Sequence, residues 1–183
     1  MESAGSTSPL FRVSQLLRER NEIDAQLGAL IKRPPSPGHL GEWIAAQIFD
    51  ITLEERANEA AIDGRFASGG LKGQTVNIKW YSKRSGNLDL SVSAHPDYYL
   101  VLTGPIARAG SSTGQLAPAR IEAVYLFHGA SLAADLVSRG RRIGTASSVL
   151  NALWDAAEIY PRSLNSIFSV TAAQTSALRL FAF

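Results

Sequence analysis

The stretch TVNIKWY, residues 75–81, decides the fold class. Its even-numbered side chains are apolar and its odd-numbered ones are mostly polar, which is the period of a half-buried strand. The stretch AAIDGRF, residues 60–66, lies upstream, and a Gly-rich turn at residues 68–70 separates the two. Together they predict two strands that pair as a hairpin.

The pattern on either side of this hairpin predicts alternating helices and strands. Apolar residues at helical spacing predict helices over 10–31, 37–50, 132–137 and 149–159. Short apolar runs predict strands over 88–92, 98–102 and 123–127, and a strand-like terminus over 178–183. This order predicts an α/β or mixed α+β domain with a central mixed sheet and flanking helices.

A proline-rich segment, KRPPSPG at residues 32–38, ends the first helix. Prolines deny amide donors and push the residues before them into extended conformations. The sequence therefore predicts an N-terminal helical arm, residues 1–33, and an α/β domain, residues 34–183. The arm is amphipathic and needs an apolar surface, which either its own domain or a second copy supplies. A homodimer through this helix is one expectation.

Composition excludes several classes of protein. Of 183 residues, 45% are hydrophobic and 19% are charged, which excludes disordered, collagenous and coiled-coil classes for the chain as a whole. The absence of cysteine excludes disulfides, thiolate metal sites and a cysteine nucleophile. No segment is apolar enough to span a bilayer, and the N-terminus lacks the features of a signal peptide. We expect a cytoplasmic protein without a membrane partner.

The cations are unevenly distributed, although the formal net charge is only +2. Five lie within twenty residues, with Asp63 almost the only acid nearby. These are Arg65, Lys72, Lys79, Lys83 and Arg84. Such a local excess favours a polyanionic partner, and we expect Lys72, Lys83, Arg84 and Arg65 to contact nucleic acid.

Three polar residues of the hairpin suggest chemistry. Asp63 lies at the end of one strand, and Asn77 and Lys79 share a face of the next. A carboxylate, a second oxygen ligand and an ammonium group can hold a hard divalent cation beside a phosphate. The sequence shows no phosphate-binding loop, no metal-spaced histidine pair and no Gly-x-Ser-x-Gly motif. The layout indicates a metal-dependent phosphodiesterase.

These residues resemble the restriction-endonuclease-like nuclease superfamily. Its motif is an Asp followed, on the next strand, by an acidic residue, any residue and Lys. Here the motif reads IDGRF at residues 62–66 and VNIKW at residues 76–80, and GEWIA at residues 41–45 resembles the preceding helix. The resemblance covers roughly residues 38–128. Asn77 departs from the pattern, because it replaces the usual acidic residue.

The resemblance implies a DNA endonuclease that hydrolyses phosphodiester bonds with Mg²⁺ or Mn²⁺. It implies Asp63, Glu42 and the backbone carbonyl of Ile78 as metal ligands. Lys79 would position the attacking water or the phosphate, and Asn77 would assist coordination weakly or through water. Two alternatives stay open: a catalytically inactive nucleic-acid-binding module, and an oligomerising interaction protein without a metal site.

Overall fold

The computed structural model describes residues 8–54, 61–93, 95–106 and 119–183. The chain divides into two units, Met1–Leu40 and Gly41–Phe183, with a boundary seven residues beyond the predicted one. Within the described residues, no helix combines the length and apolar character needed to cross a bilayer.

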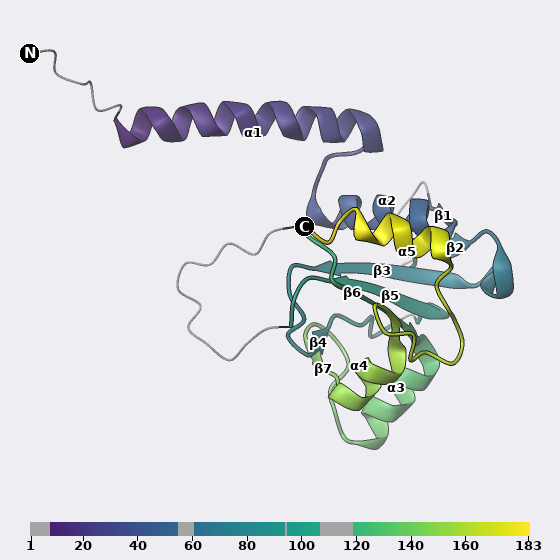
Figure 1. Ribbon diagram of the computed structural model, residues 1–183. Helices are drawn as coiled ribbons and strands as arrows, with labels where there is room; N and C mark the ends of the chain where they lie inside the picture. Colours follow the sequence, from purple (N-terminus) through teal and green to yellow (C-terminus); the bar gives the residue numbers. More distant parts are fainter. Residues whose placement is uncertain (1–7, 55–60, 94, 107–118) are drawn as a thin grey trace, which may run out of the picture. The chain divides into compact units, whose positions relative to one another are not determined.

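The first unit is dominated by helix α1, Pro9–Ile31 (Figure 1), which confirms the predicted helix. It begins with a proline in its first turn, where the missing amide hydrogen costs nothing. It ends at Lys32, whose φ of 55° is left-handed and terminates the helical path. Helix α2, Pro37–Phe49, follows and continues into the second unit.

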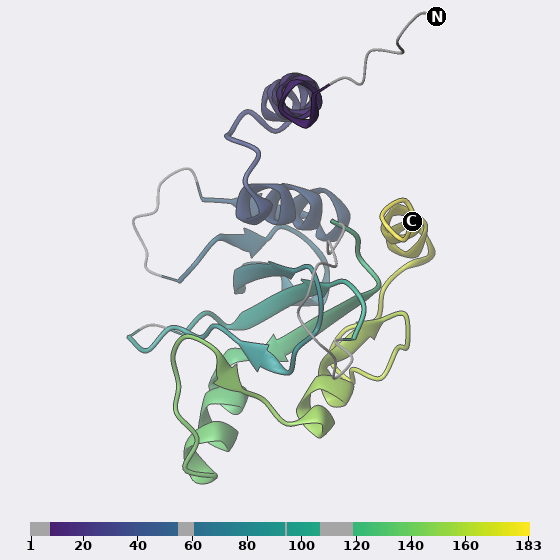
Figure 2. The same ribbon diagram turned by 90° about the vertical axis from the view of Figure 1, so that its left-hand side faces the viewer.

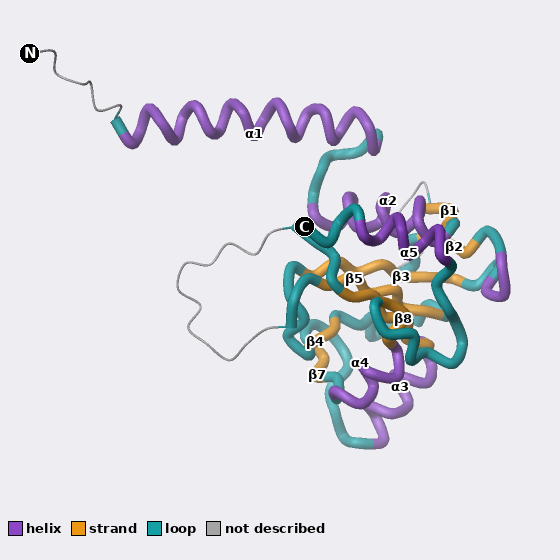
Figure 3. The backbone as a smooth tube through the Cα atoms, viewed as in Figure 1, coloured by secondary structure: helices purple, strands orange, loops and turns teal. Residues whose placement is uncertain are grey.

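The second unit is built on a six-stranded mixed sheet with the order β1-β2-β3-β5-β6-β8 (Figure 3). Its strands are β1 (Ile51–Leu53), β2 (Gly64–Phe66), β3 (Thr75–Tyr81), β5 (Tyr98–Thr103), β6 (Ala123–His128) and β8 (Glu158–Tyr160). Strands β3 and β5 are parallel, and every other neighbouring pair in this sheet is antiparallel. The predicted mixed α/β class and the predicted hairpin of β2 and β3 are confirmed.

Helices cover both faces of this sheet (Figure 2). One face packs against α2 and α5 (Ala172–Arg179), and its core includes Ile44, Val76, Ile78 and Leu178. The other face packs against α3 (Gly129–Ser138) and α4 (Asn151–Ala157), around Trp154. A small second sheet pairs β4 (Asn87–Leu88) with β7 (Ser147–Ser148), and a 3₁₀ turn, η1, spans Gly69–Leu71. Side-chain alternation along β3 therefore sends its odd-numbered residues toward the α3/α4 face.

Three local predictions are wrong. The strand predicted over 178–183 is absent: residues 178–179 end α5, which begins with a capping box of Thr171 and Gln174 and buries Leu178, and residues 180–183 form a turn and irregular backbone. The helix predicted over 149–159 stops at Ala157, and residues 158–160 form β8. The strand predicted over 88–92 is limited to β4, and Val92 is exposed.

Candidate functional site

Strands β2 and β3 separate at Asp63, immediately before β2 begins. Their last register pair is Gly64 with Val76, and the Asp63 N–H donates to the Val76 carbonyl at 2.9 Å. Two residues further along β3, the Ile78 N–H donates to Asp63 Oδ2 at 2.6 Å. A continued ladder would offer a backbone carbonyl here, whereas this chain offers a side-chain carboxylate. The Asp63 carboxylate therefore lies in the opening between the two strands.

Gly64 makes this arrangement possible, because β1 passes very close to it. A Cβ atom on residue 64 would lie 2.5 Å from the Thr52 carbonyl oxygen and 2.8 Å from Ile51 Cγ2. Only glycine fits this backbone without a shift of β1. The Asp63–Gly64 pair is thus the entry to a tightly packed strand and not the tight turn that this dipeptide often forms.

The backbone carbonyl of Ile78 points to the same opening. In a strand, the N–H and C=O of one residue project toward the same neighbour, and the Ile78 N–H meets Asp63. The carbonyl predicted as a metal ligand therefore lies on the Asp63 side of β3. The structure brings Asp63 and Ile78 together as expected.

Asn77 is the residue whose environment the sequence did not predict. Its side chain lies on the α3/α4 face and is only 4% exposed. Its Oδ1 atom is buried and has no hydrogen-bond partner among the described residues. Leaving such an atom unpaired costs about 1–3 kcal/mol. A bound water or cation would restore the missing contact of such a buried, unsatisfied oxygen.

Lys79 projects from the same face as Asn77, two residues further along β3. It is half-buried, and within the described parts of the chain its ammonium group makes no hydrogen bond or ion pair. Tyr81, the next residue on this face, donates to Asp89 Oδ2 at 3.3 Å and accepts from the Asp89 N–H at 3.0 Å. Burial raises the pKa of Tyr81 to about 12, so its hydroxyl stays protonated. The Tyr81 hydroxyl is therefore occupied by structural hydrogen bonds, and Lys79 is the neighbouring cation on this face that could contact a ligand.

Glu42 belongs to the helix that covers the opposite face of the sheet. It lies on α2, and the neighbouring Gly41 packs so closely on Trp80 that a Cβ atom there would lie 2.7 Å from Trp80 Cβ. The sheet therefore lies between the backbone of Glu42 and the side chains of Asn77 and Lys79. Within the described residues, no group of three or more His, Cys, Asp or Glu could hold a metal ion. The candidate oxygen ligands are of mixed type: the Asp63 carboxylate, the Ile78 carbonyl and the Asn77 amide.

The predicted phosphate contacts divide into two kinds. Lys72 and Lys83 are exposed. Arg65 is also exposed, and its Nε lies 3.5 Å from Glu54 Oε1. All three side chains lie at the surface.

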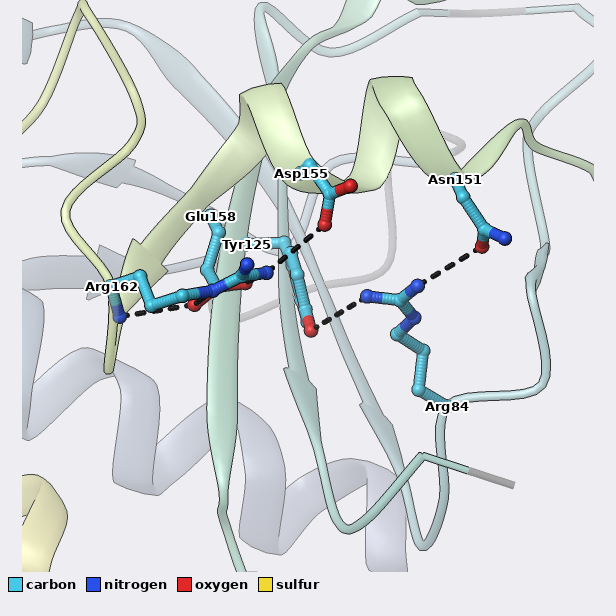
Figure 4. Close-up of polar contacts among 6 residues, drawn as sticks. All are labelled: Arg84, Tyr125, Asn151, Asp155, Glu158 and Arg162. Carbon is cyan, nitrogen blue, oxygen red and sulfur yellow. Dashed lines mark hydrogen bonds and ion pairs between the residues drawn. The ribbon is translucent and has the colours of Figure 1, made fainter. Parts of the chain in front are cut away.

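Arg84, in contrast, is a structural residue, and its predicted phosphate contact is wrong. It is 8% exposed, and its Nη1 and Nη2 donate to Tyr125 Oη at 3.2 Å and Asn151 Oδ1 at 3.0 Å (Figure 4). The guanidinium carbon also lies 5.7 Å from the Tyr125 ring centre and 5.4 Å from that of Trp154. Both Nη atoms of Arg84 donate to these protein groups, so the guanidinium group cannot bind a phosphate with both of them.

A second polar set, in which only Glu158 is buried, was not predicted. Glu158 is 2% exposed and accepts hydrogen bonds from Arg162 Nε at 2.9 Å and Nη2 at 2.6 Å (Figure 4). Arg162 also bonds to Asp155 at 3.0 Å, and these partners raise its pKa. Acidic residues seven and four positions before an arginine are the only sequence signal. This set fixes the turn after β8 and carries no catalytic feature.

The sequence matches no model of a known protein family, and no curated protein matches it significantly.

Proposed function

We propose that this protein is a metal-dependent nuclease that hydrolyses phosphodiester bonds in DNA. The observation that carries the proposal is the buried Oδ1 of Asn77, which has no hydrogen-bond partner among the described residues, one position before Ile78, whose N–H donates to Asp63 Oδ2. The mixed sheet, with a hairpin followed by a parallel strand, agrees with the restriction-endonuclease-like resemblance of the sequence.

The oxygens at the opening fit a hard cation. Mg²⁺ and Mn²⁺ prefer oxygen ligands, and Asp63, the Ile78 carbonyl and the Asn77 amide would supply three of them. A bound Mg²⁺ would lower the pKa of a water molecule and offset charge on the phosphate. The site has one carboxylate where a negatively charged pair would bind more tightly, so we expect weak affinity. By the resemblance, Glu42 adds a second carboxylate from α2.

The protein's own residues account for the remaining steps. Lys79, half-buried and without a partner among the described residues, would hold the scissile phosphate beside Asp63. Lys72, Lys83 and Arg65 would contact the flanking phosphates without reading bases. The cysteine-free sequence suits a reducing compartment, and we propose the cytoplasm.

DNA cleavage with four variants tests the enzymatic proposal. In Mn²⁺, we expect Lys79→Ala and Asp63→Asn to lose at least about a hundredfold in rate. Asn77→Asp should cut at least as fast as the wild type, because it restores a ligand charge in a nearly isosteric side chain. Arg142→Ala, an exposed change remote in sequence from the hairpin, is the control and should cut normally. Circular dichroism verifies that each variant folds. Absence of cleavage by both the wild type and Asn77→Asp would contradict the nuclease.

The neutral Asn77 also favours a second candidate, a nucleic-acid-binding module without catalysis. In that case, the exposed lysines would still contact phosphate. Replacing Lys72 and Lys83 by Ala should weaken duplex binding equally across sequences. It should also reduce the slope of the logarithm of the binding constant against the logarithm of the salt concentration by about two. Unchanged affinity and slope would contradict DNA binding and leave the interaction protein as the better account.

A further inference from the structure

Helix α1 carries a regular apolar seam. From Val13 onward, positions 13, 16, 20, 23, 27 and 30 alternate spacings of three and four residues, as in a heptad repeat. Five of these are Val, Leu or Ile, and the sixth is Arg20. Val13 is 52% exposed, Ile23 57% and Leu30 71%.

The side of α1 opposite the seam behaves as an outer surface, whereas Leu10, Phe11 and Leu17 are exposed apolar residues outside the seam positions. Positions on the far side of the seam hold polar or small residues, namely Ser14, Gln15, Arg18, Asn21, Glu22, Ala25, Gly28 and Ala29. An apolar stripe with a polar back indicates a helix that is covered along one side only.

The spacing favours a helical partner over an irregular surface. Alternate steps of three and four keep side chains on a line that another helix with the same repeat can follow. In the second unit, the helices of the domain itself already cover both faces of the six-stranded sheet. The helix that carries the matching repeat is α1 of a second copy.

We propose that α1 pairs with α1 of a second copy in an antiparallel coiled coil. Arg20 decides the orientation. In a parallel, in-register pair, two Arg20 side chains would face each other, and like charges at a core position repel. In an antiparallel pair, a core position i faces position 43 − i of the partner, so Arg20 meets the partner's Ile23, and Val13 meets the partner's Leu30.

Charges at the centre of this antiparallel pair are complementary. Arg20 Nε lies 3.5 Å from Asp24 Oδ2 within one copy. The partner's Asp24 follows the partner's Ile23 directly, so the central layer brings two arginines and two aspartates together. Their formal charges cancel.

The predicted interface is small. Five apolar seam side chains per copy, each burying on the order of 100 Å², give about 1,000 Å² in total. Specific complexes generally bury about 1,200–2,000 Å². We therefore expect a concentration-dependent dimer with a Kd in the micromolar range.

The cysteine-free chain permits a direct test of orientation by single-cysteine cross-linking. A mixture of V13C and L30C proteins, oxidised at high concentration, should form mixed disulfide dimers. V13C mixed with A25C, on the outer side, is the control and should not. Disulfide dimers from V13C alone would indicate a parallel pair, and a mixture that yields no cross-link would indicate no pair; either result overturns the proposal.

Sedimentation of cysteine-free variants provides a second readout. Arg20→Leu makes the seam continuous and should tighten dimerisation at least about tenfold. Arg18→Leu adds the same side chain on the outer side and should leave the Kd within about twofold. A full-length protein that stays monomeric at all concentrations, with Arg20→Leu equally monomeric, would show that α1 is covered by its own domain and would overturn the proposal.

Discussion

Arg84 is a buried cation that contacts side chains of the protein core. It follows Lys83 in a basic segment, which predicts a surface cation. Its guanidinium carbon instead lies 5.7 Å from the Tyr125 ring centre and 5.4 Å from that of Trp154, and its Nη2 donates to Asn151. Such stacking suits guanidinium better than ammonium, because guanidinium is planar and more weakly hydrated.

Removing this side chain should destabilise the fold. We expect Arg84→Ala to lower the free energy of unfolding by about 2–4 kcal/mol, because it removes the donor to the buried Tyr125 hydroxyl and the packing of the guanidinium group against two rings. Lys83→Ala, at the exposed neighbouring position, should change it by less than about 0.5 kcal/mol. Urea unfolding measures both, and similar losses for the two variants would contradict the structural role of Arg84.

Asp97 and Thr75 join the start of β5 to the start of β3. Asp97 Oδ2 accepts from the Thr75 N–H at 2.7 Å and from the Thr75 hydroxyl at 2.8 Å. The Asp97 N–H donates back to Thr75 Oγ1 at 2.8 Å. Hydrogen bonding from the Thr75 backbone is the main cause that lowers the pKa of Asp97 below its usual 3.8.

This link predicts a pH-dependent contribution to stability. Because the folded-state pKa is lowered, the contribution is complete above the unfolded-state pKa and disappears as the pH falls through the folded-state pKa. Asp97→Asn should therefore cost about 1 kcal/mol at pH 7, and the difference from wild type should shrink below pH 4. Exposed Asp50→Asn is the control in urea unfolding at each pH. A loss that does not depend on pH would contradict the role of the charge.

At the scale of elements, alternation and helical spacing predicted most of the fold. Residues 75–81 form β3 as expected, and the apolar runs of β5 and β6 gave strands at the correct places. The ends of the chain were harder to predict. The capping box of Thr171 and Gln174 signals the start of α5, whereas the apolar run after it resembles a strand. β8 depends on pairing with β6, which local sequence does not encode.

The candidate site was predicted in part. Pairing of the hairpin follows from local patterns, so the approach of Asp63 to β3 could be expected. The burial of Asn77 depends on the helices and loops that cover the α3/α4 face, which come from distant parts of the chain. For the same reason, α2 lies over the opposite face, and the relation of Glu42 to Lys79 could not be read from their spacing.

The β1–β2 pair sets the position of Asp63 through Gly64. We expect Gly64→Ala to cost about 1–3 kcal/mol and to weaken any function of Asp63, because the methyl group would collide with the Thr52 carbonyl. Gly70→Ala is the control, since a Cβ atom there meets nothing within 4 Å. Thermal unfolding compares the two variants. Equal stability would show that β1 shifts at little cost in free energy and that the fold does not require glycine at position 64.

At the scale of the whole second unit, β3 joins the two halves of the sheet. It pairs with the antiparallel hairpin on one edge and with parallel β5 on the other, and helices cover both faces. The hairpin register ends at Val76, near the start of β3, and the Asp63 carboxylate meets the Ile78 N–H beyond it. We propose that this opening receives a divalent cation, to which the Asn77 oxygen, without a hydrogen-bond partner among the described residues, would contribute.

Paramagnetic broadening by Mn²⁺ tests that claim most directly, because the ion broadens the NMR signals of nearby amides whether or not the protein is active. We predict saturable broadening centred on residues 62–64 and 77–79, which is lost in Asp63→Asn and appears at lower Mn²⁺ in Asn77→Asp. Broadening that does not saturate, or that is centred elsewhere in both the wild type and Asn77→Asp, would contradict a cation site at this opening.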